Sequence, residues 1–397
     1  MVLLARRGVA LREIARQSRL PLSNVQYWVQ RAARQRLDRV DFTDRSRRPL
    51  RSPNALLPKM VERILALRHH LRQQDALGEY GPVAILRTLC AQGTDKLHIP
   101  SRASIANVLK RHALVAPPRR FRRPPPPPGW HLPDLAAART ELDSFDVVEG
   151  LIIQQVGEVQ ILNAISLHGG LCSSFLDATI TAHFTQNALL AHWRAHGLPA
   201  YAQFDNDLRF HGPHHHPDRL GSVALFCLAL GVCPVFAPPR EHGLQNQIES
   251  FNCLWQAKVW ARFHHAHRAQ LRRRSDRFVA AHYIKSQDRR ETAPPRLQWP
   301  PEPLQTRADP KAVFIRRTDD QGRVRLLANA FAVDSNWKHR LVRCEVYLRS
   351  QTILCFGLRR TQPEHQPLLI TYHATTNITQ FADYLQRITD ANATYAK

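Results

Sequence analysis

Two short stretches decide the fold of this 397-residue chain: Gln203-Phe204-Asp205-Asn206-Asp207 and Asn246-Gln247-Ile248-Glu249-Ser250-Phe251-Asn252. The first is typical of a short apolar strand that ends in a carboxylate, and the second of the first turn of a helix that carries another carboxylate. A fold that brings such acids together makes an oxygen-lined site for hard divalent cations. The pair therefore predicts an α/β domain equipped for metal-dependent phosphodiester chemistry.

Around these stretches the apolar pattern predicts strands and helices in a definite order. Strands are expected at 145–153, 159–166, 171–178, 200–204 and 232–236, and helices at 181–196, 221–230 and 244–267. Three consecutive strands followed by alternating helices and strands are the order of a ribonuclease H-like α/β core, which we place at 136–300. Further alternation predicts a small β-barrel at 301–375, with a C-terminal tail at 376–397.

The N-terminal part predicts all-α modules. Helices at 11–19 and 24–36, joined by Leu20-Pro21-Leu22 and with Ser23 as N-cap of the second, outline a helix-turn-helix domain at 1–50. A plain helical hairpin is the structural alternative. Residues 51–118 predict a second helical DNA-binding module, with helices at 61–73, 83–90 and, capped by Ser101, 103–112. Arginines followed by five prolines, from 119 to 128, predict a basic, stiff linker at 119–135.

The net charge of +24 predicts a polyanionic partner, double-stranded DNA. The sequence has no apolar run of membrane-spanning length and no signal-peptide-like start. Its seven cysteines form no CxxC pair and suit reduced thiols. We therefore expect a cytoplasmic, nucleoid-associated protein of bacterial origin.

Three acids fall at positions that the predicted fold brings to one rim of its sheet: Asp146, Asp205 and Glu249. Asp143 is an alternative to Asp146, because residues three apart in a strand point to opposite faces and only one of the two can face a metal. An isolated acid at such a position is ordinarily a cap or a solvated residue. Together, in a basic protein, the three predict a site for two Mg²⁺ (or Mn²⁺) ions.

These motifs resemble those of insertion-sequence DDE transposases of the retroviral-integrase superfamily, and the resemblance covers nearly the whole chain. It rests on Asp143-Ser144-Phe145-Asp146, Phe204-Asp205-Asn206, Pro238-Pro239-Arg240-Glu241 and Ile248-Glu249-Ser250-Phe251-Asn252. It implies that Asp146, Asp205 and Glu249 are catalytic metal ligands. It also implies cleavage at an element's ends, strand transfer into target DNA, and homo-oligomers that hold two ends together.

Candidate DNA contacts come from three places. They are Ser23, Asn24, Gln26, Tyr27 and Arg31 on the second helix, Arg122 and Arg123 in the linker, and Asn252, Gln256, Lys258 and Arg262 beyond Glu249. Two alternatives stay open. Asp207 stands where the family commonly has glycine, which favours a catalytically decayed, DNA-binding relative. A stand-alone nuclease of the same fold is the other. The histidines at 211 and 214–216 are more typical of solvated surface than of a metal site.

Overall fold

The computed structural model describes the chain apart from residues 45–54, 93–98, 116–126, 212–219, 239–240, 242, 301–307, 328, 374–377 and 396–397. The predicted DNA contacts Arg122 and Arg123, the histidines at 214–216, and Pro239 and Arg240 of the quoted motif lie outside the described residues. Contacts divide the chain into two compact units, Met1–Glu62 and Arg63–Lys397, which are taken separately.

The first unit contains the predicted pair of helices. Ile14 and Val25, one on each helix, are fully buried. The prediction that Ser23 is the N-cap is wrong: the carbonyl of Pro21 accepts the backbone N–H groups of Asn24 and Val25, so the helix begins earlier and Ser23 lies in its first turn. The helix also ends before residue 36. The elements are α1 (Val2–Arg6), α2 (Leu11–Ser18), α3 (Leu22–Arg31) and the short η1 (Leu37–Arg39).

The predicted helices of the second module are present, and the division between the two units falls within the first of them. Ser101 caps the third helix as predicted, because its hydroxyl oxygen accepts the backbone N–H of Ser104 at 3.1 Å. Ile85 and Ile105 are fully buried. The elements are α4 (Pro58–Gln74), α5 (Pro82–Ala91) and α6 (Arg102–Arg111).

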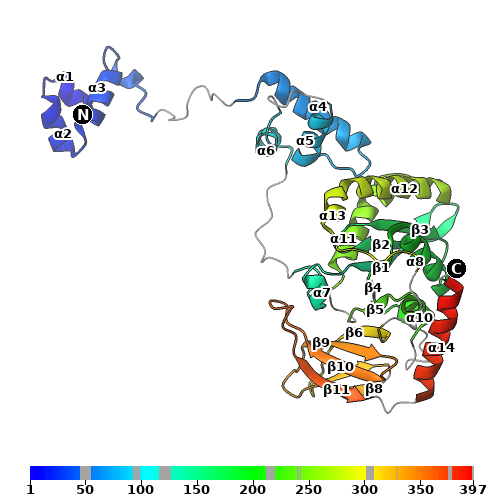
Figure 1. Ribbon diagram of the computed structural model, residues 1–397. Coiled ribbons are helices and arrows are strands. Elements are labelled where there is room, and N and C mark those ends of the chain that lie inside the picture. The colour runs from blue at the N-terminus through cyan, green and yellow to red at the C-terminus, as the bar shows by residue number, and fades with distance from the viewer. Residues whose placement is uncertain are drawn as a thin grey trace. The chain divides into compact units, whose positions relative to one another are not determined.

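A nine-stranded mixed sheet forms the centre of the second unit (Figure 1). Its first five strands match the predicted ones within three residues at each end. β1, β2 and β3 are antiparallel neighbours, and β4 and β5 continue the sheet from β1 in parallel. The strands are β1 (Leu142–Ile153), β2 (Gly157–Ser166), β3 (Cys172–Asp177), β4 (Tyr201–Phe204) and β5 (Cys233–Phe236).

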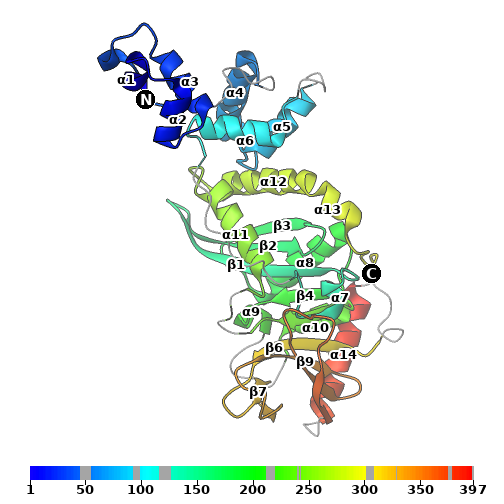
Figure 2. The ribbon, with the colours of Figure 1, turned by 90° about the vertical axis from the view of Figure 1, so that its left-hand side faces the viewer.

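Helices cover both faces of this sheet. On one face Phe145 and Phe204 pack in a core with Trp193 of α8 (Ala182–His196) and Phe226 of α10 (Ser222–Ala229). On the other, apolar residues of β1 and β2 pack against α11 (Asn246–Trp255), η3 (Gln256–Trp260) and α12 (Arg268–Lys285). Figure 2 shows α12 along the β2–β3 side. Short helices are α7 (Pro133–Ala136), α9 (Leu208–His211) and α13 (Gln287–Thr292).

The single helix predicted for 244–267 is interrupted. α11 continues into the π-turn η3, and the chain then breaks before α12. The His265 ring contacts the carbonyls of Val259 and Trp260 at 3.2 and 3.3 Å, and His267 caps α12 by accepting the N–H of Gln270. Two local histidines thus satisfy backbone groups at the break, which the apolar pattern alone does not reveal.

The predicted separate β-barrel is not confirmed. Its strands extend the central sheet, because β6 pairs in parallel with β5, and Phe314 stacks on Phe236 at 5.1 Å. The predicted C-terminal tail forms a helix, and its Ile388 is fully buried in the core beside α10. The elements are β6 (Lys311–Arg317), β9 (Leu341–Tyr347), β10 (Thr352–Gly357), β11 (Leu368–His373), the ribbon β7 (Arg323–Leu326) and β8 (Asn329–Ala332), and α14 (Ile378–Tyr395). Across the described residues, no helix has both the length and the apolarity to span a membrane.

Candidate active site

Asp146, Asp205 and Glu249 come from three separate elements that meet on the α11 face of the sheet. Ser144 of β1 is in parallel register with Gln203 of β4, so Asp146 and Asp205 each lie two residues further along neighbouring chains. Glu249 is in the first turn of α11. Burial, together with the negative charges of Asp205 and Glu249, raises the pKa of Asp146 to about 6. Burial also raises the pKa of Asp205. Asp146 therefore lies within the electrostatic reach of both other acids.

Asp143 points to the opposite face of β1, as strand alternation predicts. Its carboxylate is fully buried and accepts two hydrogen bonds from the guanidinium of Arg296, at 2.9 and 2.6 Å, and one from Nε1 of Trp193 at 3.0 Å. Burial by itself would raise the pKa of Asp143, but the charge and hydrogen bonds of Arg296 hold it well below its usual range. Asp143 is thus occupied inside the fold, on the face away from Asp205 and Glu249.

A chain of buried amides holds Asp146. Nδ2 of Asn252 donates to Asp146 Oδ2 at 2.7 Å, and Oδ1 of Asn252 accepts from Asn163 at 2.8 Å. Ser174 in turn donates to Asn163 at 2.6 Å. Asn252, predicted to contact DNA, is only 7% exposed. Its amide is committed to the fold, so this prediction is corrected: Asn252 orients the carboxylate of Asp146.

Sequence reasoning missed Asn163, which lies opposite Asp146 in the hairpin of β1 and β2. Asp146 and Asn163 are cross-strand partners in the antiparallel register of β1 and β2. Side chains of such partners lie on the same face of the sheet. The register shifts by one residue between Val148 and Leu151, so counting back from the turn would place Ala164 opposite Asp146, and only the structure identifies Asn163 as its partner.

Asp207 is neutralised by an arginine that the sequence analysis also missed. Its Oδ1 accepts from the backbone N–H and from Nε of Arg209, at 2.8 and 2.7 Å. Arg209 also forms an ion pair with Glu149 at 2.8 Å. Hydrogen bonding from Arg209 lowers the pKa of Asp207, and the N–H of Asp207 donates to Asp205. The extra carboxylate therefore brings its own counter-ion to the loop that carries Asp205.

The donor chemistry of Asp146, Asp205 and Glu249 suits a hard divalent cation, because carboxylate oxygens are the ligands that Mg²⁺ prefers. The raised pKa of Asp146 reflects its burial first and then the negative charges of Asp205 and Glu249. Within the described ranges, no three His, Cys, Asp or Glu side chains are gathered closely enough to hold a metal ion as they stand. The three carboxylates fit such an ion by the chemistry of their oxygen donors.

On α3 the predicted DNA contacts divide into two kinds. Ser23, Asn24, Gln26 and Tyr27 are exposed. Arg31 is largely covered: its guanidinium pairs with Asp41 at 2.9 Å and donates to the carbonyl of Thr43. Four of these five side chains are thus available at the surface, and the fifth has intramolecular partners.

The basic residues beyond Glu249 are also engaged. Lys258 donates to the carbonyl of Gly78 at 3.0 Å, and Arg262 donates to the carbonyl of Asp75 at 2.7 Å. Both side chains thus bind the loop after α4, and their role as phosphate contacts stays a prediction. Gln256 is exposed on η3. The arginines of α12 were not singled out from the sequence, yet Arg268, Arg272 and Arg273 line one surface cavity.

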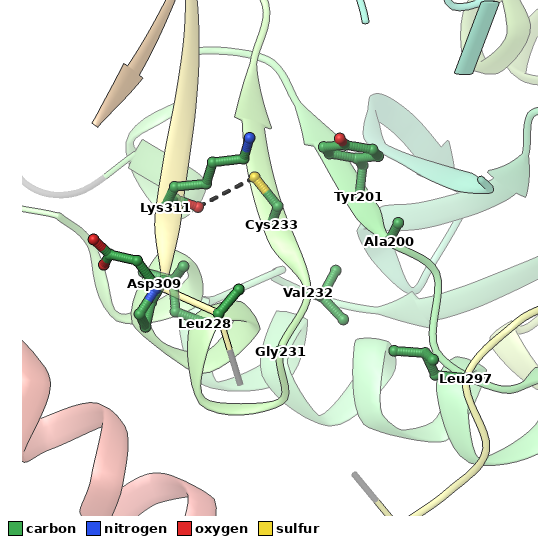
Figure 3. A pocket seen from close by; sticks show the side chains of 11 residues that line it. Ala200, Tyr201, Leu228, Gly231, Val232, Cys233, Leu297, Asp309 and Lys311 are labelled. Carbon is green, nitrogen blue, oxygen red and sulfur yellow. Dashed lines mark hydrogen bonds between the residues drawn. The ribbon is translucent and has the colours of Figure 1, made fainter. Parts of the chain in front are cut away.

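A separate cavity of about 260 Å³ lies at the starts of β4, β5 and β6, at the edge opposite Asp205 (Figure 3). The side chains of Tyr201, Cys233 and Lys311 gather there, and the thiol of Cys233 donates to the carbonyl of Lys311 at 3.1 Å. The amine of Lys311 pairs with Glu345 at 2.7 Å. Asp146, Asp205 and Glu249 are not among the described residues that line this cavity.

Comparisons with known proteins add little. No protein-family model and no curated protein matches the sequence. Among solved structures, the chain is similar to one from a cryo-EM structure of the simian T-cell lymphotropic virus intasome in complex with PP2A regulatory subunit B56 gamma. The identity is 13% and the TM-score 0.32, covering 68% of this chain and 91% of that chain. A similarity at this level establishes neither a shared fold nor a shared activity.

Proposed function

We propose that this protein is a DNA recombinase of the DDE transposase type, which cleaves at the ends of a DNA element and transfers the freed strands into target DNA. One observation carries the proposal. Asp146, Asp205 and Glu249 come from three different elements, and the charges of Asp205 and Glu249 both act on Asp146, in a protein with a net charge of +24. The strand order β3-β2-β1-β4-β5, which is the order of a ribonuclease H-like core, supports it.

Asp146, Asp205 and Glu249 would hold two Mg²⁺ or Mn²⁺ ions. When bound, such ions activate an attacking oxygen and stabilise the leaving oxygen of a phosphodiester. The chain's own residues prepare the carboxylates for this role. Asn252 fixes the direction of Asp146 through a bond to one oxygen, and Arg209 neutralises Asp207 beside Asp205. These supporting contacts are of the kind that orient metal ligands in other proteins.

Double-stranded DNA is the proposed partner, because a phosphate backbone complements the basic charge. The exposed side chains Asn24, Gln26 and Tyr27 on α3 would read an element end, as the second helix of a helix-turn-helix does. Two ends must be joined in one reaction, so we propose a homo-oligomer as the active form.

The test uses labelled duplexes taken from the DNA that flanks the coding sequence. Full-length protein with Mg²⁺ or Mn²⁺ is expected to nick these duplexes and to join the freed ends to a second duplex. Asp205→Ala should abolish both reactions while leaving duplex binding intact. Binding without cleavage would identify a DNA-binding protein that lacks catalysis, and cleavage of any duplex without joining would identify a nuclease.

A further inference from the structure

A second cavity, of about 170 Å³, adjoins the candidate active site. Residues from the segment before α7, from β1 and β4, and from the start of α11 enclose it. Those that matter for its chemistry are Trp130, His131, Ser144, Gln203, Asn246 and Gln247.

The position of this cavity follows from the spacing of its residues from the three acids. Ser144 precedes Asp146 by two residues in β1, and Gln203 precedes Asp205 by two residues at the end of β4. Residues two apart in extended chain lie on the same face. Asn246 precedes Glu249 by three residues in α11, which places both on one side of the helix. Each acid therefore has a cavity residue next to it on its own element.

The lining of the cavity combines apolar surface with several polar groups, and it is uncharged. Among the described residues that line it there is no Lys, Arg, Asp or Glu. It contains the hydroxyl of Ser144 and the amides of Gln203 and Gln247, beside the apolar Trp130. Nε2 of Gln203 donates to the carbonyl of Leu244 at 3.1 Å, which leaves its amide oxygen for a ligand. This composition disfavours a phosphate or a metal ion, because either would require charged partners when taken out of water.

His131, which also lines the cavity, has two ring nitrogens without hydrogen-bond partners among the described residues. It is 3% exposed. Burial, with a smaller contribution from the charge of Arg343, lowers the pKa of His131 to about 4, so the ring is neutral near pH 7. A neutral imidazole has one donor and one acceptor. Buried polar groups normally find partners, so this unpaired ring is consistent with a ligand that carries both types of group.

We propose that this cavity receives one unpaired nucleobase from a DNA strand that lies at the candidate active site. A nucleobase is flat, uncharged and edged with both donors and acceptors, which matches the lining. A cavity of about 150 Å³ in another protein accommodates a benzene ring, so this volume admits an aromatic ring of that class. The inference rests on the proposed function and narrows its substrate to DNA with an unpaired nucleotide at or near the reacting strand end.

The test compares two short duplexes of the same arbitrary sequence, one blunt and one with a single unpaired 2-aminopurine nucleotide at a 3′ end. Binding to full-length protein is measured with Ca²⁺ in place of Mg²⁺. The wild type should prefer the overhang by about fivefold or more, since contact with an aromatic residue contributes on that order per base. The emission of 2-aminopurine should change on binding.

Ser144→Met, which fills the cavity, should reduce the preference to less than about twofold and leave binding of the blunt duplex unchanged. The matched control is Ser250→Met, at an exposed position of α11 outside the cavity, which should keep the full preference. Because Ser144 is buried, thermal melting accompanies each measurement. If Ser144→Met does not fold, Gln247→Ala at a half-buried position replaces it, with the same expected loss.

Three results would overturn the inference: no overhang preference in the wild type, an unchanged preference in a folded cavity variant, or an equal preference for an overhang that lacks its base. The proposed function fails differently. If Asp205-dependent cleavage persists without any overhang preference, only the cavity assignment is wrong. If the preference is present but no duplex is ever cleaved or joined, the cavity stands and the catalytic proposal falls.

Discussion

The two faces of β1 give the same kind of side chain opposite environments. Asp143 faces α8, where its carboxylate accepts hydrogen bonds from Arg296 and Trp193. Asp146 faces α11, where Asp205 and Glu249 add negative charge and its side-chain donor is the neutral amide of Asn252. The difference teaches that the carboxylate of Asp143 stabilises the fold, whereas that of Asp146 lowers the stability of the fold. Ionisable groups that are held in an electrostatically unfavourable environment are candidates for function.

The largest expected effect is the loss of cleavage activity when Asp146 is replaced. Asp146→Asn should reduce end cleavage by about 10³-fold or more, because a metal ligand contributes several kcal/mol to transition-state stabilisation. The free energy of unfolding at pH 7 should equal or exceed that of the wild type, because the substitution removes one negative charge from a site where negative charges repel each other. Gel-based cleavage and urea unfolding measure the two properties. Wild-type rates in Asp146→Asn would show that the two faces do not differ as proposed.

The next effect is on stability. Asp143→Asn should lower the free energy of unfolding by about 3–5 kcal/mol, because it leaves the guanidinium of Arg296 without its buried partner. Replacing both residues, as Asp143→Leu with Arg296→Met, should recover much of the loss, since an apolar pair needs no counter-charge. Urea unfolding of both variants makes the comparison. A single variant as stable as the wild type would remove the structural role of the pair.

Asn252→Ala should reduce cleavage by about 10- to 100-fold, the range found when a residue that orients a metal ligand is removed. The apparent requirement for Mg²⁺ should rise along with it, because Asp146 loses its orientation. Gln256→Ala, four residues away and exposed, is the control and should not change the Mg²⁺ requirement. A titration of cleavage rate against Mg²⁺ reads out both. Equal behaviour of the two variants would return Asn252 to a purely structural role.

The opposite pKa shifts of Asp143 and Asp146 predict opposite dependences of stability on pH in metal-free buffer. The depressed pKa of Asp143 means that its contribution is present above its ordinary pKa of 3.8 and is lost as the pH falls through the lower value. The raised pKa of Asp146 means that its contribution is present below 3.8 and is lost as the pH rises through about 6. Thermal melting from pH 3 to 8 should therefore show Asp146→Asn gaining relative stability between about pH 4 and 6.

The smallest effect concerns Asp207. Asp207→Gly should change cleavage by less than about fivefold, because Arg209 already offsets the added charge and a partly exposed ion pair contributes about 1 kcal/mol or less. Arg209→Gln should be the more harmful change, since it leaves Asp207 and Glu149 unpaired beside Asp205. Cleavage rates of the two variants decide the order. A strong gain of activity in Asp207→Gly would show that this carboxylate impairs the site.

Features set by neighbouring residues could be predicted from the sequence, and features set by long-range contacts could not. Alternation located β1 to β5 within three residues at each end, and the hydroxyl of Ser101 marked its helix, because these signals lie within a few neighbouring residues. The break after η3 depends on His265 reaching back to carbonyls, and the extension of the sheet depends on Phe314 meeting Phe236. Such contacts join residues whose proximity the local pattern does not encode.

The sequence by itself determined the order of strands and helices, the three acids and the basic charge, because periodicity and residue chemistry are local properties. Only the tertiary structure decided which aspartate of β1 is neutralised, that Asn252 and Asn163 support Asp146, and that an uncharged cavity lies beside the acids. The physical reason is that burial and electrostatic environment depend on which distant groups pack together. An aspartate has the same intrinsic pKa at 143 and at 146 until α8 and α11 cover opposite faces of the strand.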